Sequence, residues 1–227
     1  MNKILFTLCF CFCLSHLSSA QMSAGFSLGF MNYHGDLTQR YIDHKEVNIS
    51  YGVFVAKRYA NPKLSLKGHL QLGTISGNDA NYISRANRGL KFTSPITFVG
   101  TALEYAPLAR KNFNSEGEFI PQTNIFASAG FGFTFFNPKV QGLDDKAPDR
   151  IAEISKTMFT IPLSIGIRFD MSQEWTLALE GKYFMPFTDY LDGISAAASP
   201  ANSDKYLFFG LSLARKWGDM KGVRMKR

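Results

Sequence analysis

The sequence predicts an all-β protein: an eight-stranded, up-and-down, antiparallel transmembrane β-barrel with long external loops and short periplasmic turns. Three observations predict it, namely eight alternating segments, connections that alternate in length, and a second face rich in glycine and polar residues. The segment 159–169 is the clearest, because every odd position is large and apolar. Successive side chains of a strand point to opposite faces. An apolar face opposite a polar face that suits a narrow lumen must lie against lipid.

The first three expected strands lie near residues 23–31, 47–58 and 63–74. Each alternates apolar residues with mostly small or polar ones, so one face suits lipid and the other a lumen. The residues expected to face lipid in these strands are Ala24, Phe26, Leu28 and Phe30, then Val47, Ile49, Tyr51, Val53 and Val55, then Leu64, Leu66, Leu70 and Leu72.

The remaining expected strands lie near residues 92–105, 124–135, 159–169, 174–185 and 205–215, and the first of these alternates least clearly. Each of the eight approaches or exceeds the roughly 9–11 residues that a tilted strand needs to cross a bilayer. The residues expected to face lipid here are Ile125, Phe131, Phe133 and Phe135, then Phe159, Ile161, Leu163, Ile165, Ile167 and Phe169, then Trp175, Leu177, Leu179 and Tyr183, then Leu207, Phe209, Leu211 and Leu213.

The connections between these segments alternate in length. Those at 58–62 and 170–173 are tight, and the link at 107–121 is intermediate and falls on the short side. The long connections are 33–46, 75–91, 137–156 and 186–204. Outer-membrane barrels have short periplasmic turns and long external loops, and an even strand count places both termini in the periplasm.

Both ends of the sequence have a distinct composition. Residues 1–20 are expected to be a secretory signal peptide, because an apolar stretch follows Lys3 and small residues precede a cleavage site after Ala20. The barrel is expected to span residues 21–217, with a basic periplasmic tail at 218–227. All three cysteines lie in the leader, so the mature chain has no thiol for a disulfide or metal site. This pattern predicts the outer membrane of a Gram-negative bacterium.

Charged residues also occur at positions expected to face the lumen. They form a predicted lumen charge network of Lys67, His69, Glu104, Arg168, Glu180 and Lys182. An eight-stranded barrel is only wide enough for side chains. Isolated charges would be unfavourable there, so we expect opposite charges to pair across the lumen as a salt-bridged plug. The alternative is that Glu180 and Lys182 lie near one end and are solvated.

Other functions find little support in the sequence. The net charge is +7, but the charges are dispersed among the strands, so we expect no nucleic-acid partner. We expect no cofactor, no metal site and no catalytic residue. An enzyme would need a clustered Ser/His/Asp or two-carboxylate site, and a Glu104–Glu180 pair would need substrate access. The sequence therefore predicts a non-enzymatic protein.

Several short motifs resemble those of one family. Residues 32–37 resemble a Y-x-G-D-L signature, residues 85–92 with 103–105 an R-N-R-x-L-x-F … E-Y segment, and residues 125–127 with 136–139 an F-A-G … F-N-P-K strand. Residues 188–192 and 202–206 resemble D-Y-L-D and N-x-D-x-Y motifs. The motif residues are Tyr33, Gly35, Asp36, Leu37, Asn137, Pro138, Asp189, Tyr190, Leu191 and Asp192. In this order they resemble the PorG-like outer-membrane barrels of the type IX secretion and gliding machinery.

The resemblance implies a structural role. PorG-like proteins are thought to tie the outer membrane to a periplasmic ring built from the lipoprotein PorK and its partner PorN. The expected function is therefore an anchoring component of the type IX machinery, with outer-membrane lipid and PorK/PorN-like ring proteins as partners. The alternative is a small porin or a ligand-binding outer-membrane barrel.

Basic residues near the expected turns and the C-terminus suggest a partner surface. The candidate contact residues are Arg58, Lys63, Arg110, Lys111, Lys216, Lys221, Arg224, Lys226 and Arg227. Their shared sign would steer an acidic partner in the periplasm. The alternative for the tail is a frayed and solvated chain end.

Overall fold

The computed structural model describes most of the chain after residue 20. The described residues are 21–35, 38, 43–59, 61–82, 89–110, 112–114, 116–142, 155–188, 190–193 and 204–218. The expected signal peptide at 1–20 and the expected tail beyond residue 218 lie outside them. Within these ranges, no helix is long and apolar enough to cross a bilayer.

Eight long strands form the barrel, and one short strand extends it. They are β1 (Gln21–His34), β2 (Asn48–Arg58), β3 (Leu64–Asn78), β4 (Lys91–Tyr105), β5 (Gln122–Phe136), the short β6 (Lys139–Gln141), β7 (Thr157–Asp170), β8 (Trp175–Pro186) and β9 (Lys205–Trp217). A 3-10 helix, η1 (Asp79–Asn81), follows β3. The long strands neighbour one another in chain order, and all of their pairings are antiparallel.

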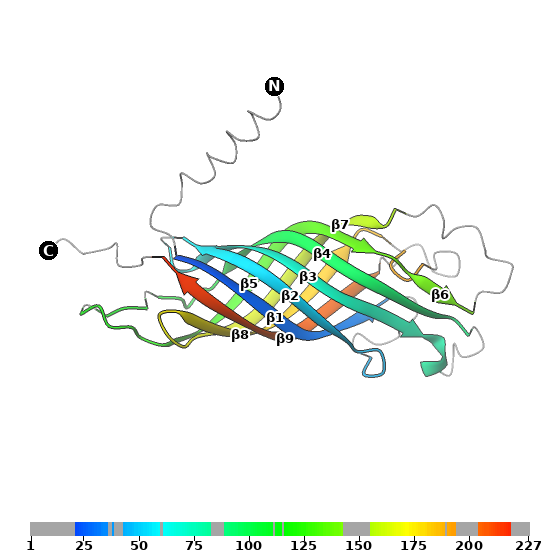
Figure 1. Cartoon of the computed structure of the whole chain (residues 1–227), viewed down its shortest axis with the longest axis horizontal. Coiled ribbons are helices and arrows are strands. Elements are labelled where there is room, and N and C mark those ends of the chain that lie inside the picture. Colours follow the sequence, from blue (N-terminus) through cyan, green and yellow to red (C-terminus); the bar gives the residue numbers. More distant parts are fainter. Residues whose placement is uncertain are drawn as a thin grey trace, which may run out of the picture.

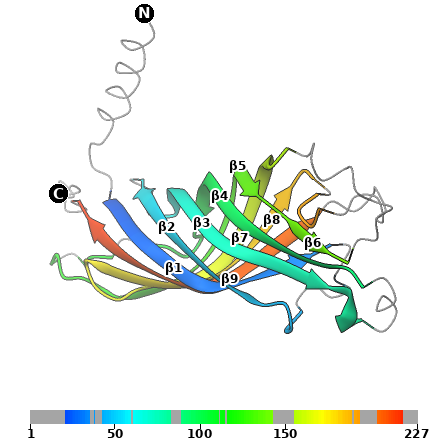
Figure 2. The ribbon, with the colours of Figure 1, turned by 45° about the vertical axis from the view of Figure 1, so that its right-hand side comes forward.

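The first and last strands close the barrel. β1 pairs with β9 from Met22–Trp217 to His34–Lys205, and the strands slope around a single closed wall (Figures 1 and 2). Closure leaves no strand edge, so the backbone groups of the wall are satisfied without water. The expected eight-stranded antiparallel barrel is confirmed.

The connections divide the barrel into two ends. The start of β1, the end of β9 and the β2–β3 and β7–β8 turns lie at one end, which we call the turn end (left in Figure 1). The connections that follow β1, β3, β5 and β8 lie at the other, which we call the loop end. Because periplasmic turns are short in outer-membrane barrels, we assign the turn end to the periplasm.

The strands extend further than the apolar alternation indicates. β1 continues to His34 rather than 31, and β3 continues to Asn78 rather than 74. The backbone ladder persists beyond the lipid zone, where outward side chains need not be apolar. The short β6 was not expected. It pairs with the start of β4 after β5 has ended, so it prolongs the wall at the loop end.

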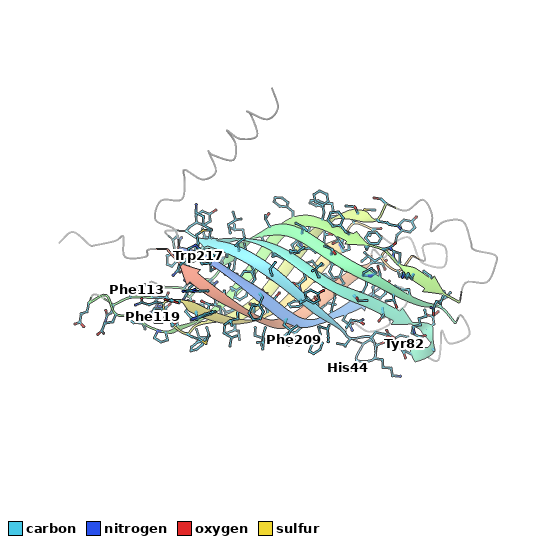
Figure 3. All side chains as sticks on the ribbon, in the orientation of Figure 1. His44, Tyr82, Phe113, Phe119, Phe209 and Trp217 are labelled. Atoms are coloured by element: carbon cyan, nitrogen blue, oxygen red, sulfur yellow. The ribbon has the colours of Figure 1, made fainter. Side chains whose placement is uncertain are left out.

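The outer surface carries a band of apolar side chains. None of the residues expected to face lipid is buried, and Ile49 and Ile165 are each 66% exposed. Figure 3 shows these side chains projecting from the ribbon. Soluble proteins rarely expose a continuous apolar surface of this kind. The band therefore faces the hydrocarbon core of a membrane, as predicted.

The lumen is not polar throughout. The half of the lumen nearer the loop end, here called the loop half, contains a buried apolar cluster. We call this cluster the aromatic layer, and it consists of Met31, Tyr33, Ile75, Leu90, Phe92, Ile96, Phe98, Phe136, Phe184, Leu191, Tyr206 and Phe208. Phe184 stacks on Tyr206 with ring centroids 4.5 Å apart, and Phe98 meets Phe184 edge-on at 5.0 Å. The polar lumen expected from the sequence is therefore not found in this half, which is lined by apolar and aromatic side chains. The aromatic layer also explains the weak alternation of β4, where the apolar Phe92, Ile96 and Phe98 point inward and the outward positions are Lys91, Thr93, Pro95 and Thr97.

Glycines make room for these rings. Gly100 and Gly132 pair across β4 and β5, and Phe98 lies over both. A Cβ atom at Gly132 would lie 2.6 Å from Cζ of Phe98. Phe208 covers the Gly29–Gly210 pair in the same way. Side chains thus fill the loop half from wall to wall.

The assignment of the outer face to lipid can be tested by placing an arginine on that face at two different depths in the membrane. Ile165→Arg places a guanidinium against lipid near the middle of β7, and we expect a loss of about 2–4 kcal/mol in unfolding free energy. Met171→Arg, just past the turn end of β7, should cost about 0–1 kcal/mol. Denaturant unfolding of the protein refolded into vesicles measures both. Equal losses would contradict the assigned membrane zone.

Candidate functional site

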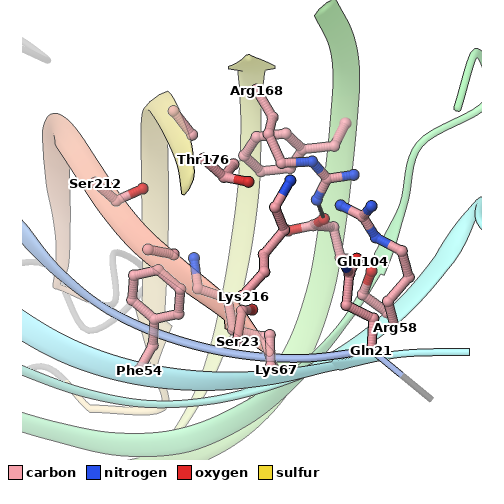
Figure 4. A pocket seen from close by; sticks show the side chains of 15 residues that line it. Gln21, Ser23, Phe54, Arg58, Lys67, Glu104, Arg168, Thr176, Ser212 and Lys216 are labelled. Carbon is pink, nitrogen blue, oxygen red and sulfur yellow. Dashed lines mark hydrogen bonds and ion pairs between the residues drawn. The ribbon is translucent and has the colours of Figure 1, made fainter. Parts of the chain in front are cut away.

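The half of the lumen nearer the turn end, here called the turn half, contains a group of buried charged side chains. These are at most 9% exposed, and we call them the buried charges: Arg58, Lys67, Glu104, Arg168, Asp170, Glu180, Lys182 and Lys216. They come from six strands and point inward because their positions share the parity of the lumen face. Figure 4 labels five of them, which line a pocket together with uncharged side chains: Arg58, Lys67, Glu104, Arg168 and Lys216.

The innermost charges centre on Glu180. Lys67 Nζ lies 3.0 Å from Glu180 Oε2, and Lys182 Nζ lies 3.0 Å from Glu180 Oε1. Lys182 also donates to Oε1 of Gln71 at 3.2 Å. β3 and β8 are four places apart among the eight strands, so the Lys67–Glu180 pair spans the lumen. These residues are not solvated at an end, because each is at least 92% buried.

A second pair joins Arg168 of β7 to Glu104 of β4. Arg168 Nη1 donates to Glu104 Oε1, and the guanidinium lies over the ring of Phe126 with 5.7 Å between Cζ and the centroid. Nε and Nη2 of Arg168 have no hydrogen-bond partner among the described residues. Glu104 and Glu180 are thus each held by a cation, as in a structural network.

The outermost charges centre on Asp170, which sequence reasoning assigned to a turn. Its carboxylate lies 3.0 Å from Lys216 Nζ and 3.7 Å from Arg58 Nη2. It also accepts hydrogen bonds from Thr176 Oγ1 at 2.6 Å and from Asn112 Nδ2 at 3.0 Å. Asp170 continues the inward parity of β7, and that parity was the signal that could have identified it.

Two candidate contact residues were placed wrongly. Arg58 and Lys216 were expected on the periplasmic surface, but they are only 9% and 5% exposed and pair with Asp170 inside the barrel. Both occupy inward positions at the ends of their strands, so a partner cannot reach them as a surface. A position near a strand end does not by itself make a side chain exposed, because the inward parity of the strand continues to its last residues.

His69 was expected to take part in the charge network. It faces the lumen and is 8% exposed, but neither ring nitrogen has a hydrogen-bond partner among the described residues. Its ring instead lies 5.0 Å from the ring of Phe98. His69 therefore lies at the boundary between the charges and the aromatic layer.

The motif residues are partly brought together at the loop end. The Tyr33 hydroxyl lies 2.9 Å from Asp192 Oδ2 and 2.5 Å from Asp204 Oδ1. The backbone N–H of Leu191 donates to Asp204 Oδ2 at 2.9 Å. These contacts tie the β8–β9 connection to β1. The motif thus has a structural role in closing this end.

Other motif residues flank this cluster. Gly35 follows β1, and Tyr190 packs against the aromatic layer. Asn137 and Pro138 connect β5 to β6, and Pro138 lies close to Gly193. The motif residues Asp36, Leu37 and Asp189 lie outside the described residues.

The turn end carries a hairpin that sequence reasoning treated as a plain link. Phe113 and Phe119 form a β-bridge, with ring centroids 5.9 Å apart. The hairpin, described at residues 106–110, 112–114 and 116–121, extends away from the barrel, and both rings are labelled in Figure 3. Its tip turns at Gly117, where φ is +86°, a conformation that suits glycine. Glu116 and Glu118 make that tip acidic.

The structure describes two of the remaining candidate contact residues. Lys63 and Arg110 are exposed at the turn end. Lys111, Lys221, Arg224, Lys226 and Arg227 lie outside the described residues. Because the hairpin tip and Glu174 are acidic, the described turn-end surface has mixed charge rather than the shared positive sign that was expected.

A cavity of about 50 Å³ lies within the turn half. Its charged lining is Arg58, Lys67, Glu104, Arg168 and Lys216, and it reaches Gln21 at the start of β1 (Figure 4). Space of this size holds a few waters or one small ion. Among the described residues, no group of three or more His, Cys, Asp or Glu side chains could hold a metal.

Comparison with known proteins places the chain in a family and a fold. The sequence matches the family described as "Domain of unknown function (DUF6089)" over residues 3–225. No curated protein sequence matches it. The structure is similar to Neisserial surface protein A (NspA), with a TM-score of 0.54 and 10% identity, covering 88% of this chain and 98% of that chain. At this identity the likeness shows a shared barrel fold.

Two further solved structures are similar. One is a major outer membrane protein from Thermus thermophilus, with a TM-score of 0.47 and 12% identity over 88% of this chain and 100% of that chain. The other is Ail of Yersinia pestis, with a TM-score of 0.45 and 8% identity over 88% and 99%. The lipid-facing band and the barrel fold together confirm the expected outer-membrane location.

The shared carboxylate gives a test of the lumen network. Glu180→Gln keeps the shape but leaves Lys67 and Lys182 without a counter-charge, and we expect a loss of about 3–5 kcal/mol in unfolding free energy. The control is Glu174→Gln, which breaks an exposed pair with Arg215 and should cost about 1 kcal/mol or less. Urea titration in vesicles measures both. Similar losses would show that the network is solvated.

Proposed function

This chain belongs to the DUF6089 family, and we propose that it is a non-enzymatic, structural outer-membrane barrel that anchors a periplasmic complex. The observation that supports the proposal is the filled lumen. Rings and ion pairs from opposite strands occupy the space that a pore would need. A barrel without a passage acts through its faces, and only its periplasmic face is accessible to a periplasmic complex.

The alternative of a small porin is less well supported. An eight-stranded barrel leaves room only for side chains, and here these include bulky rings such as Phe98 and Phe184. The small cavity in the turn half does not pass the aromatic layer. A conduit would require the aromatic layer and the salt bridges to move together.

We further propose that the periplasmic complex is a ring of PorK/PorN-like proteins of the type IX secretion machinery. The support is the order of the motifs, which resembles that of PorG-like barrels over nearly the whole mature chain. The structure adds that the motif residues Tyr33, Leu191 and Asp192 support the loop end. Conservation of these residues would therefore preserve the barrel, while the partner would meet the opposite end.

The turn-end hairpin, residues 106–121, is the best-defined contact surface. It is held by the Phe113–Phe119 bridge and by two hydrogen bonds, in which Asn114 Nδ2 donates to Glu118 Oε2 and the backbone N–H of Glu118 donates to Asn114 Oδ1. Leu108 and Ile120 at its base are 62% and 45% exposed. Lys63 and Arg110 lie at the same end. This surface offers a partner both apolar and charged contacts, and it replaces the uniformly basic surface.

Conductance separates an anchor from a porin. In planar bilayers we expect the purified protein to show no steady ion current, because the aromatic layer occupies the loop half of the lumen and ion pairs cross the turn half. The measurement is single-channel recording across a range of voltages. A stable, large conductance from the intact protein would support the porin alternative.

Partner recovery tests the anchor directly. Reversing the hairpin tip with Glu116→Lys and Glu118→Lys, or deleting residues 218–227, should lower recovery of periplasmic partners after crosslinking of native outer membranes. Both variants keep β9 and the barrel ladder, so they should still insert and resist heat in detergent gels. Because tip and partner attract through charge, recovery should also fall with salt.

The matched control reverses two exposed charges at the loop end, Lys91→Glu and Lys139→Glu. It should leave partner recovery unchanged. Loss of partners in this control with full recovery in the turn-end variants would place the contact outside the cell. If even the full-length protein recovers no periplasmic partner, the anchor proposal fails.

A further inference from the structure

The turn half of the lumen holds more positive than negative charge. Its five bases are Arg58, Lys67, Arg168, Lys182 and Lys216, and its three acids are Glu104, Asp170 and Glu180. Two of the acids are each shared by two bases. The described residues therefore leave an excess of two positive charges among side chains that are at least 91% buried. Buried charge without a counter-charge is strongly unfavourable, so this excess calls for a partner.

The unbalanced charge gathers around one cavity. Four of the five bases line it, together with the single acid Glu104. Each of these side chains belongs to a residue at least 91% buried, so they cannot turn out to water. Arg58 and Arg168 are close enough to repel one another and are both attracted to Glu104. Glu104 thus pairs with one guanidinium group and attracts the other.

Arg168 has unused donors at this cavity. Nη1 donates to Glu104, whereas Nε and Nη2 have no partner among the described residues. Buried donors are nearly always satisfied, by protein, water or a bound ion. Nε and Nη2 also form the edge of a guanidinium that pairs bidentately with carboxylate or phosphate oxygens. The unpaired donors of Arg168 therefore lie at the same cavity as the excess positive charge.

We propose that the turn half is a binding site for a small oxyanion of the phosphate class, which enters from the periplasm. Arg168 donates through Nε and Nη2, Arg58 donates from the opposite side, and Lys67 and Lys216 supply further positive charge. The cavity, about 50 Å³, fits one inorganic oxyanion and excludes a substituted phosphodiester. The site neutralises the excess charge and joins strands β2, β3, β7 and β9.

Titration calorimetry with inorganic phosphate tests the site. The full-length folded protein is used in a maltoside detergent without phosphate headgroups, in a chloride-free buffer. We expect saturable binding of one phosphate per barrel. Arg168→Gln should weaken it about tenfold or more, because it removes a charged donor pair. Glu104→Gln should tighten it about tenfold, because it removes the competing negative charge.

The opposite signs of these two variants separate binding from folding, since a purely structural pair would respond alike to the loss of either member. Arg58→Gln provides a second weakening variant if Arg168→Gln does not fold, and Arg215→Gln at the exposed pair with Glu174 is the matched control that should bind as the parent does. Heat resistance in detergent gels confirms folding of each variant.

Three results would overturn the proposal. The first is the absence of saturable heat with the parent protein, which would mean that waters fill the cavity. The second is parental affinity in Arg168→Gln or Arg58→Gln. The third is equal competition by a soluble glycerophosphodiester, which would point to a lipid headgroup at the rim instead of an enclosed oxyanion. Sulfate, which has the same shape, should compete with phosphate.

Discussion

The width of an eight-stranded barrel is the constraint on which the rest of this structure depends. The wall leaves an interior wide enough only for side chains, so inward side chains from different strands must be complementary in size or in charge. At the loop end the match is steric: a ring such as Phe98 lies over paired glycines. At the turn end it is electrostatic, and cations cross the lumen to shared carboxylates such as Glu180. Both solutions pin strands together from the inside.

This constraint also limits what the protein can do. A lumen occupied by side chains that stabilise the wall is not available for transport, and the apolar band of the outer face contacts lipid. Specific recognition is left to the two ends. At the loop end, Tyr33 and Asp204 already bind each other, which holds β1 to the β8–β9 connection. The turn end keeps an ordered hairpin with exposed side chains, so it is the face that retains capacity for a partner.

The period-2 pattern was enough to predict the wall, because lipid enforces alternation on the outer face. It could not predict which side chains fill the lumen, because inward residues pack against and pair with residues on strands that are distant in sequence. The segment 92–105 alternated least clearly, and in the structure its Phe98 and Phe92 point inward to meet the rings of Phe184 and Tyr33. Arg58, Lys216 and Asp170 were misplaced for a related reason. Pairing continues past the apolar band, so strand ends that seemed to be surface turns still face inward.

Asp170 links the features of the turn end into one unit. It accepts a hydrogen bond from Asn112 at the base of the hairpin, and it pairs with Lys216 near the end of β9. Lys216 Nζ also lies 5.4 Å from the ring centroid of Phe119, across the hairpin. A partner that moves the hairpin therefore pulls on the same carboxylate that balances the bases around the cavity. The hairpin and the charge balance of the lumen are thus coupled through one residue, so under the anchor proposal a load on the hairpin would reach the wall of the barrel through Asp170.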